Sequence, residues 1–259
     1  MNALFSGKRV LVTAGSDGIG RVTAESFLKA GARVHVCSRN GEKLKRCASE
    51  LPGLTFTAAD VSKYEDVERV FADIEEKLGG LDILVNNAGI SGPTGRVDEI
   101  EPEAWEQTMR TNIDSQFFCA RLAVPMMIKA GGGAIVNMGS TASLFAYPLR
   151  SPYAASKWAV IGFTKTLAQE LGRFKIRANA ICPGCVNGPR IDGVIKREAS
   201  ALGVAEDVIR QGYLDQTAMN TFIDAGDIAD MCLYLCSPAG AKISGQVLVV
   251  DGFTENCHS

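Results

Sequence analysis

The sequence predicts an α/β fold, in which a doubly wound parallel sheet of about seven strands carries helices on both faces. Short β-branched runs alternate along the chain with segments whose apolar residues recur at helical spacing. A glycine-rich turn joins the first such run to the first such segment. With 259 residues, 46% hydrophobic and 22% charged, the composition is typical of a globular chain with a sizeable core. We therefore expect a single domain over residues 1–259.

The first half of the chain establishes the alternation. Lys8 to Thr13 (KRVLVT) is a short β-branched run and is expected as a strand, and Ile19 to Ala30 is expected as a helix that ends before Gly31. Strands that alternate with helices of this length imply parallel, right-handed crossovers. The other elements expected in this half are strands at Arg33 to Ser38, Leu54 to Ala59 and Leu81 to Val85, and helices at Gly41 to Leu51 and Tyr64 to Leu78.

The second half continues the alternation and interrupts it twice. Ser91 to Asp98 is rich in Gly and Pro, and residues 188–225 form a polar stretch of weak periodicity. Long insertions of this kind are usually functional, so we expect a substrate lid segment at about residues 188–225. The regular elements expected in this half are strands at Ala134 to Met138, Lys175 to Ile181 and Gln246 to Val250, and helices at Pro102 to Ala130, Pro152 to Gly172 and Asp227 to Cys236.

Charge and composition exclude several classes of partner. The chain has 27 Lys and Arg against 29 Asp and Glu, a net charge of −2, so it shows no basic footprint for nucleic acid or an anionic membrane. No apolar run approaches the roughly 20 residues that span a bilayer, and Met1 to Lys8 lacks the apolar core of a signal peptide. We expect a cytoplasmic protein whose 8 cysteines are reduced thiols, because a chain of this length folds without disulfides.

The first expected strand runs directly into a glycine turn, Thr13 to Gly20 (TAGSDGIG). Glycines let the backbone approach a pyrophosphate there, and the N-terminus of the next helix offers free N–H groups and a partial positive charge. This context predicts a dinucleotide site of the Rossmann type. The G-x-x-G-x-G spacing differs from the usual G-x-G-x-x-G, and a purely structural turn is the alternative. The residues expected at the cofactor are Gly15, Ser16, Asp17, Gly18, Ile19 and Gly20.

The end of the second strand should meet the adenosine ribose of the cofactor. Ser38 and Arg39 stand there. A serine does not repel a 2′-phosphate and a guanidinium pairs with one, so NADP(H) is preferred and NAD(H) is the alternative. The negative charge of Asp17 in the glycine turn argues against a phosphate nearby. The structural alternative for Arg39 is a solvated residue at the start of the next helix. Asp60 and Val61, which follow the third strand, are expected near the adenine.

Tyr153 and Lys157 have i,i+4 spacing in an expected helix and therefore lie on one face. An ammonium beside a phenol stabilises the phenolate and lowers a pKa that is ordinarily near 10, which makes a general acid/base. Alone, such a pair is also common on protein surfaces. Ser140 ends the preceding strand, at the edge of the sheet where open α/β folds bind ligands.

Together these motifs resemble the short-chain dehydrogenase/reductase family from Lys8 to about Gly252. The resemblance implies that Tyr153 donates or accepts the proton, that Ser140 hydrogen-bonds the substrate oxygen, and that Lys157 binds the nicotinamide ribose. It also implies that Asn112 holds a water that relays protons to Lys157. The remaining residues that it places at the cofactor, in Asn86-Asn87-Ala88-Gly89 and in the loop that opens with Pro183-Gly184, are Asn87, Ala88, Gly89, Pro183, Gly184 and Val186.

The sequence departs from the family pattern at two positions. Ala14 stands in place of the first family glycine, so we expect the flexible position to move to Gly15 and binding to be retained. Gly188 stands where the family usually has a Thr whose hydroxyl helps to hold the nicotinamide carboxamide. We expect that contact to pass to the backbone of Val186 or to a lid residue.

Two other features of the sequence bear on redox and metal chemistry. Cys182-Pro183-Gly184-Cys185 imitates a redox C-x-x-C motif, but it ends a strand and does not open a helix, so we interpret it as the nicotinamide loop with incidental thiols. His35 and His258 are far apart in the sequence and show no ligand spacing, so no metal site is expected.

Arg150 and Arg190 are candidates to contact an anionic group of the substrate, such as a carboxylate. An ion pair with Asp192 or Glu198 is the structural alternative for them. The polar composition of the lid segment favours a small polar substrate.

We conclude from the sequence that the chain is an NADP(H)-preferring oxidoreductase that interconverts a secondary alcohol and a ketone, the substrate being a small-molecule carbonyl or alcohol. A 3-oxoacyl-carrier-protein reductase is an alternative that would need a basic docking patch. A non-catalytic nucleotide-sensing protein is an alternative of another class, and Ser140, Tyr153 and Lys157 argue against it. The family resemblance implies a homotetramer.

Overall fold

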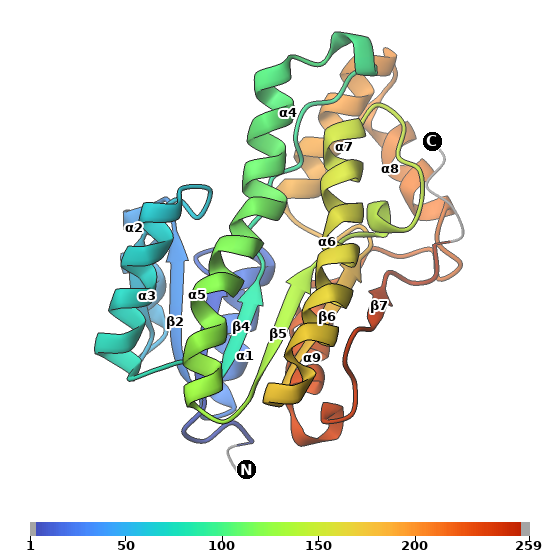
Figure 1. Ribbon diagram of the computed structural model, residues 1–259. Helices are drawn as coiled ribbons and strands as arrows, with labels where there is room; N and C mark the ends of the chain where they lie inside the picture. The colour runs from blue at the N-terminus through green and yellow to red at the C-terminus, as the bar shows by residue number, and fades with distance from the viewer. Residues whose placement is uncertain (1–3, 255–259) are drawn as a thin grey trace.

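The computed structural model describes residues 4–254 and confirms the predicted fold class (Figure 1). Seven strands form one parallel sheet in the order β3-β2-β1-β4-β5-β6-β7. All predicted strands are present. The central strands are mostly buried, and such strands appear in the sequence as short apolar runs. The strands are β1 (Arg9–Thr13), β2 (Arg33–Ser38), β3 (Thr55–Ala58), β4 (Ile83–Asn86), β5 (Gly133–Met138), β6 (Ile176–Pro183) and β7 (Val247–Val250).

Helices cover both faces of the sheet and bury two separate apolar clusters. On one face, Phe27 of α1 and Ile228 of α9 pack in the first cluster. On the other face, Ile74 of α3, Ala123 of α5 and Leu167 of α6 pack in the second. This three-layer arrangement leaves only the ends of the strands open for a site. The helices whose predicted positions are confirmed are α1 (Gly18–Lys29), α2 (Gly41–Glu50), α3 (Tyr64–Leu78), α6 (Ser151–Leu171) and α9 (Ala225–Cys236).

The helix predicted from Pro102 to Ala130 is a long rod in Figure 1, but it is not one regular α-helix. It consists of α4 (Pro102–Met109), a π-helical turn at Arg110–Asp114 and α5 (Ser115–Lys129). The Ser115 N–H donates to the Arg110 carbonyl five residues back, which widens this turn by one residue. π-turns are frequent at functional sites, and this one carries Asn112.

The segment 188–225 contains two helices that its weak periodicity did not predict, α7 (Pro189–Leu202) and α8 (Glu206–Asp215). They pack on each other through Ile191, Ile195 and Ile209, in a third apolar cluster separate from the two on the faces of the sheet. In Figure 1 they lie beyond the carboxyl ends of the strands. The segment predicted as a lid is thus a compact pair of helices.

The sheet order places a switch point between β1 and β4, where the chain stops building one half of the sheet and begins the other. Open α/β sheets bind ligands at this point, outside the carboxyl ends of the strands. Within residues 4–254, no helix is long and apolar enough to cross a membrane, and no group of three metal-binding side chains is found. The seven cysteines in that range form no disulfide bond, while Cys257 and His258 lie outside it.

Candidate active site

The glycine turn connects β1 to α1, and Asp17 caps the helix by accepting a hydrogen bond from the Gly18 N–H at 2.9 Å. Ala14 adopts a left-handed conformation with φ of 51°, so the flexible position has not moved to Gly15 as expected. Gly15 is needed for another reason, because a Cβ there would lie 2.5 Å from Cγ1 of Val36 on β2. The turn still leads into α1 at the switch point of the sheet.

The turn fits a dinucleotide pyrophosphate. A Cβ on Gly18 would meet nothing within 4 Å, so the space over the N-terminus of α1 is open. A Cβ on Gly20 would lie 2.4 Å from the Ala14 carbonyl oxygen and 2.5 Å from Nδ2 of Asn87, so Gly20 allows the turn to close against β4. Free N–H groups at a helix N-terminus beside open space are suited to binding an anion.

One cleft of about 550 Å³ runs from the end of β2 across the glycine turn to the N-terminus of α6. Of the residues predicted at the site, Gly15, Gly20 and Asn112 do not line this cleft, and the first two act by close packing within the turn. The predicted residues that do line it are Ser16, Asp17, Gly18, Ile19, Ser38, Arg39, Asp60, Val61, Asn87, Ala88, Gly89, Ser140, Arg150, Tyr153, Lys157, Pro183, Gly184, Val186 and Arg190.

At the β2 end of the cleft, Arg39 is exposed and Ser38 pairs with Ser16 through a hydroxyl–hydroxyl hydrogen bond of 2.9 Å. Lys43, which the sequence analysis missed, also lines the cleft from the first turn of α2 and binds Asp17 at 2.6 Å. The Lys43 hydrogen bond is the largest influence on Asp17 and holds the pKa of that carboxyl below its usual range. The negative charge that opposed a phosphate here is therefore paired with a cation.

The loop after β4 is tied to β1 and to the π-turn. The Thr13 hydroxyl accepts hydrogen bonds of 2.9 Å from the N–H groups of Asn87 and Ala88. Asn112 is fully buried, and its amide accepts from the Ile90 N–H at 2.7 Å and donates to the Ile90 carbonyl at 3.0 Å. Asn112 thus fixes the backbone next to Gly89. The sequence did not predict this contact, because the two residues meet only in the folded chain.

The residues predicted as the acid/base pair, Tyr153 and Lys157, line the other end of the cleft. Lys157 is buried and donates to the Met138 carbonyl at 2.8 Å, and its Nζ lies 5.8 Å from the centre of the Tyr153 ring. Burial alone would raise the pKa of Tyr153, but the charges of Lys157 and Arg190 and a hydrogen bond from Ser140 bring the pKa of its phenol below the ordinary value. Burial has the opposite effect on a cation and lowers the pKa of Lys157. A lowered pKa brings a phenol closer to the pH range in which general acid/base catalysis is efficient.

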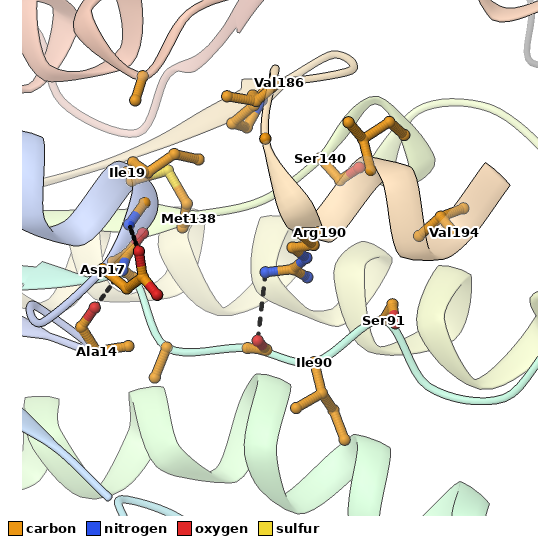
Figure 2. Close-up of a pocket in the computed structure, with 18 of the residues that line it drawn as sticks. Ala14, Asp17, Ile19, Ile90, Ser91, Met138, Ser140, Val186, Arg190 and Val194 are labelled. Atoms are coloured by element: carbon orange, nitrogen blue, oxygen red, sulfur yellow. Dashed lines mark hydrogen bonds between the residues drawn. The ribbon is translucent and has the colours of Figure 1, made fainter. Parts of the chain in front are cut away.

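Arg190 begins α7 and reaches across the cleft, where Nη1 donates to the Gly89 carbonyl at 3.3 Å (Figure 2). It is exposed, and no carboxylate of residues 4–254 lies within ion-pairing distance of it. The structural alternative of a pair with Asp192 does not hold, because Asp192 pairs with Arg210. Arg190 thus presents an unpaired cation beside the Tyr153 phenol.

Arg150 has a different environment, which matches the structural alternative. It is only 1% exposed and pairs with Glu198 of α7 at 3.3 Å. The hydroxyls of Tyr147 and Tyr213 contact the same carboxylate, and the sequence analysis did not predict these two tyrosines as site residues. No motif marks them, because they come from separate parts of the chain.

Gly188, in place of the usual Thr, has φ of 135°, a conformation that a threonine rarely adopts. The loop before it pairs with Ile223, whose N–H donates to the Cys185 carbonyl and whose carbonyl accepts from the Asn187 N–H, both at 2.8 Å. In this arrangement the N–H and carbonyl of Val186 take no part in the bridge. They are the groups that the sequence analysis expected to replace the threonine hydroxyl.

The sheet order and the cleft at its switch point define a Rossmann-type fold with an open site for a dinucleotide. The family model described as "short chain dehydrogenase" matches residues 8–199. The chain is 32% identical over 255 residues to D-beta-hydroxybutyrate dehydrogenase of Rhizobium meliloti (strain 1021), covering 95% of this chain and 97% of that protein. The chain belongs to the short-chain dehydrogenase/reductase family.

Two solved structures extend the comparison. An actinorhodin polyketide ketoreductase variant with NADPH superposes with a TM-score of 0.91 at 32% identity, covering 95% of this chain and 96% of that chain. A xylitol dehydrogenase with NAD⁺ superposes with a TM-score of 0.93 at 25% identity, covering 96% of this chain and 99% of that chain. The protein is an NAD(P)-dependent oxidoreductase that interconverts alcohols and ketones.

Proposed function

We propose that the protein is an NADP(H)-preferring carbonyl reductase or alcohol dehydrogenase. Tyr153 would exchange the proton, Ser140 would hold the substrate oxygen, and Lys157 would bind the nicotinamide ribose and lower the pKa of Tyr153. The lowered pKa of the Tyr153 phenol, beside Lys157 and Ser140, carries this proposal. The nicotinamide would supply or accept the hydride. Negative charge that develops on the substrate oxygen would be met by the hydroxyls of Ser140 and Tyr153. Asn112, which fixes the loop next to Gly89, would support the proton relay to Lys157.

Replacement of Tyr153 by Phe tests this proposal, because it removes the hydroxyl and keeps the ring. Turnover on a panel of ketones should fall by about 10²–10⁴-fold, the usual contribution of a positioned acid/base. Titration with NADPH should show retained cofactor binding. Retained turnover would contradict the role of Tyr153, and absence of turnover by the unmodified protein on every carbonyl would revive a nucleotide sensor.

The cofactor proposal rests on two cations at the β2 end of the cleft, Arg39 and Lys43. They are suited to a 2′-phosphate, and the paired carboxylate of Asp17 offers little repulsion. The remaining cofactor residues would follow the cleft from Asp60 and Val61 at the adenine to Val186 at the nicotinamide.

The substrate proposal is a small ketone or alcohol that carries a carboxylate. Arg190 is the cation free to meet such a group, whereas Arg150 is paired with Glu198. The helices α7 and α8 would cover the substrate.

Exposed Phe117 on α5 and Trp158 on α6 support the homotetramer that the family resemblance implies, since apolar side chains of this size favour burial between subunits.

Replacement of Arg190 by Gln tests the substrate class. The preference for a carboxylate-bearing ketone over its neutral analogue, measured as the ratio of kcat/KM values, should fall by about 10-fold or more, because a charge-assisted hydrogen bond contributes about 1.5–3 kcal/mol. Lys196→Gln, at an exposed position of α7 outside the cleft, is the matched control. If the ratio is unchanged and only the affinity for NADPH falls, Arg190 serves the cofactor and the carboxylate proposal is wrong.

A further inference from the structure

A buried polar cluster lies between the catalytic helix and the two helices of the lid. It consists of Tyr147, Arg150, Glu198 and Tyr213, and we call it the Glu198 cluster. Arg150 is 1% exposed and Glu198 is 6% exposed. Arg150 and the two tyrosines line the cleft, and Glu198 lies behind them. A buried ion pair is costly unless other hydrogen bonds complete it, so its presence at this place calls for a physical reason.

Glu198 accepts hydrogen bonds from three separate parts of the chain. Tyr213 of α8 donates to Oε2 at 2.6 Å, and Arg150, just before α6, donates to Oε1 at 3.3 Å. The hydroxyl of Tyr147 lies 2.5 Å from that of Tyr213 and 3.4 Å from Oε1. One carboxylate of α7 therefore joins both lid helices to the loop that leads into the catalytic helix.

Arg150 transmits this arrangement to the catalytic tyrosine. Its guanidinium carbon lies 5.3 Å from the centre of the Tyr153 ring and 5.2 Å from that of Tyr147. Its Nη2 donates to the Ser91 carbonyl at 2.6 Å, while its Nε is buried without a hydrogen-bond partner in the described part of the chain. The guanidinium is thus held from both sides of the cleft at a fixed distance from the Tyr153 ring.

We propose that Arg150, held in place by Glu198, is a positioning residue that keeps a fixed positive charge beside the Tyr153 phenol and links the packing of α7 and α8 to the proton-transfer step. The inference rests on the proposed role of Tyr153. The other groups that face Tyr153 are Lys157 of α6, Arg190 of α7, Ser140 after β5 and Tyr147. Lys157 in turn lies near Cys182 of β6.

The pH dependence of kcat/KM separates this role from a merely structural one. Arg150→Met removes a cation near the phenol, so the midpoint of the kcat/KM pH profile that reports the titration of Tyr153 should move to higher pH. Glu198→Gln removes the negative charge that opposes Arg150, so the midpoint should move to lower pH. A purely structural cluster would lower activity or stability in both variants and would not move the two midpoints in opposite directions.

Further variants complete the test. Arg150→Lys keeps the charge and should keep the midpoint of the unmodified protein. Arg150→Gln, which removes the charge but keeps a hydrogen-bond donor, takes the place of Arg150→Met if that variant does not fold. Tyr213→Phe removes a hydrogen bond of Glu198 without changing charge, so the midpoint should stay and only KM should rise. Midpoints that do not move, or move together in Arg150→Met and Glu198→Gln, overturn the inference. If Tyr153→Phe keeps its turnover in the same assay, the proposed function itself fails.

Discussion

The cofactor preference can be tested at the β2 end of the cleft, where Arg39 is exposed and free to bind a phosphate. Replacement of Arg39 by Ala removes the proposed charge-assisted contact with the 2′-phosphate, and a contact of this kind contributes about 1.5–3 kcal/mol. Since about 1.4 kcal/mol corresponds to a tenfold change in affinity, NADPH should bind about 10–100-fold more weakly. NADH has no 2′-phosphate, so its affinity should not change.

Lys43 should contribute less, because it already has a partner. Its ion pair with Asp17 is solvent-exposed, with 45% of the Lys43 side chain and 69% of the Asp17 side chain accessible. Such surface pairs contribute only about 0–1 kcal/mol, so Lys43 can turn to a phosphate at little cost. We expect Lys43→Ala to weaken NADPH binding about 3–10-fold, the loss of about 0.7–1.4 kcal/mol.

The assay is a pair of fluorescence titrations with NADPH and NADH at one low salt concentration, since screening weakens exposed charges. Lys45→Ala is the matched control, because Lys45 also lies on α2 but pairs with Glu42 outside the cleft. An equal loss of NADPH and NADH affinity in Arg39→Ala would mean that Arg39 holds the ribose or the turn. Unchanged NADPH binding in both variants would refute the phosphate site.

Two further predictions concern the folded state. Gly20→Ala should lower the free energy of unfolding by about 1–3 kcal/mol and weaken NADPH binding, because its Cβ would overlap Ala14 and Asn87; Gly18→Ala, which meets only a strained φ of 51°, should cost about 1–2 kcal/mol. His35 is fully buried, and burial lowers its pKa to about 4 while the unfolded chain titrates near 6.5, so the folded protein resists protonation that the unfolded chain accepts. Its contribution is complete above about pH 6.5 and should be lost by up to about 1.4 kcal/mol per pH unit between 6.5 and 4, which urea unfolding of the protein and of His35→Gln at several pH values measures. Equal pH slopes in the two proteins would contradict this.

The alternation of strands and helices was predictable because each element carries its own apolar pattern. β4 is buried at every residue and therefore appears as a continuous apolar run, and α3 has the predicted bounds. The π-turn at Arg110–Asp114 was not predictable, because a widened turn changes one hydrogen bond and leaves the apolar spacing nearly intact. A pattern of apolar residues cannot distinguish the two.

The helices α7 and α8 escaped prediction for a different reason. Their inward faces mix apolar side chains such as Ile195 and Ile209 with the polar groups of Glu198 and Tyr213, which are also buried. A helical period is visible only when the buried face is apolar. The polar groups that conceal the period are those whose hydrogen bonds hold the two helices together.

This difference explains why the reaction class was predictable and the substrate was not. The Tyr153–Lys157 pair depends only on the period of one helix, and the open turn at Gly18 depends on a few adjacent residues. The surroundings of the substrate depend on Arg150 and Glu198, which are 48 residues apart and meet only when α7 packs over the strand ends. Because the same packing leaves Arg190 unpaired and holds Arg150 against Tyr153, selectivity for the substrate and the acidity of Tyr153 should change together when α7 is displaced.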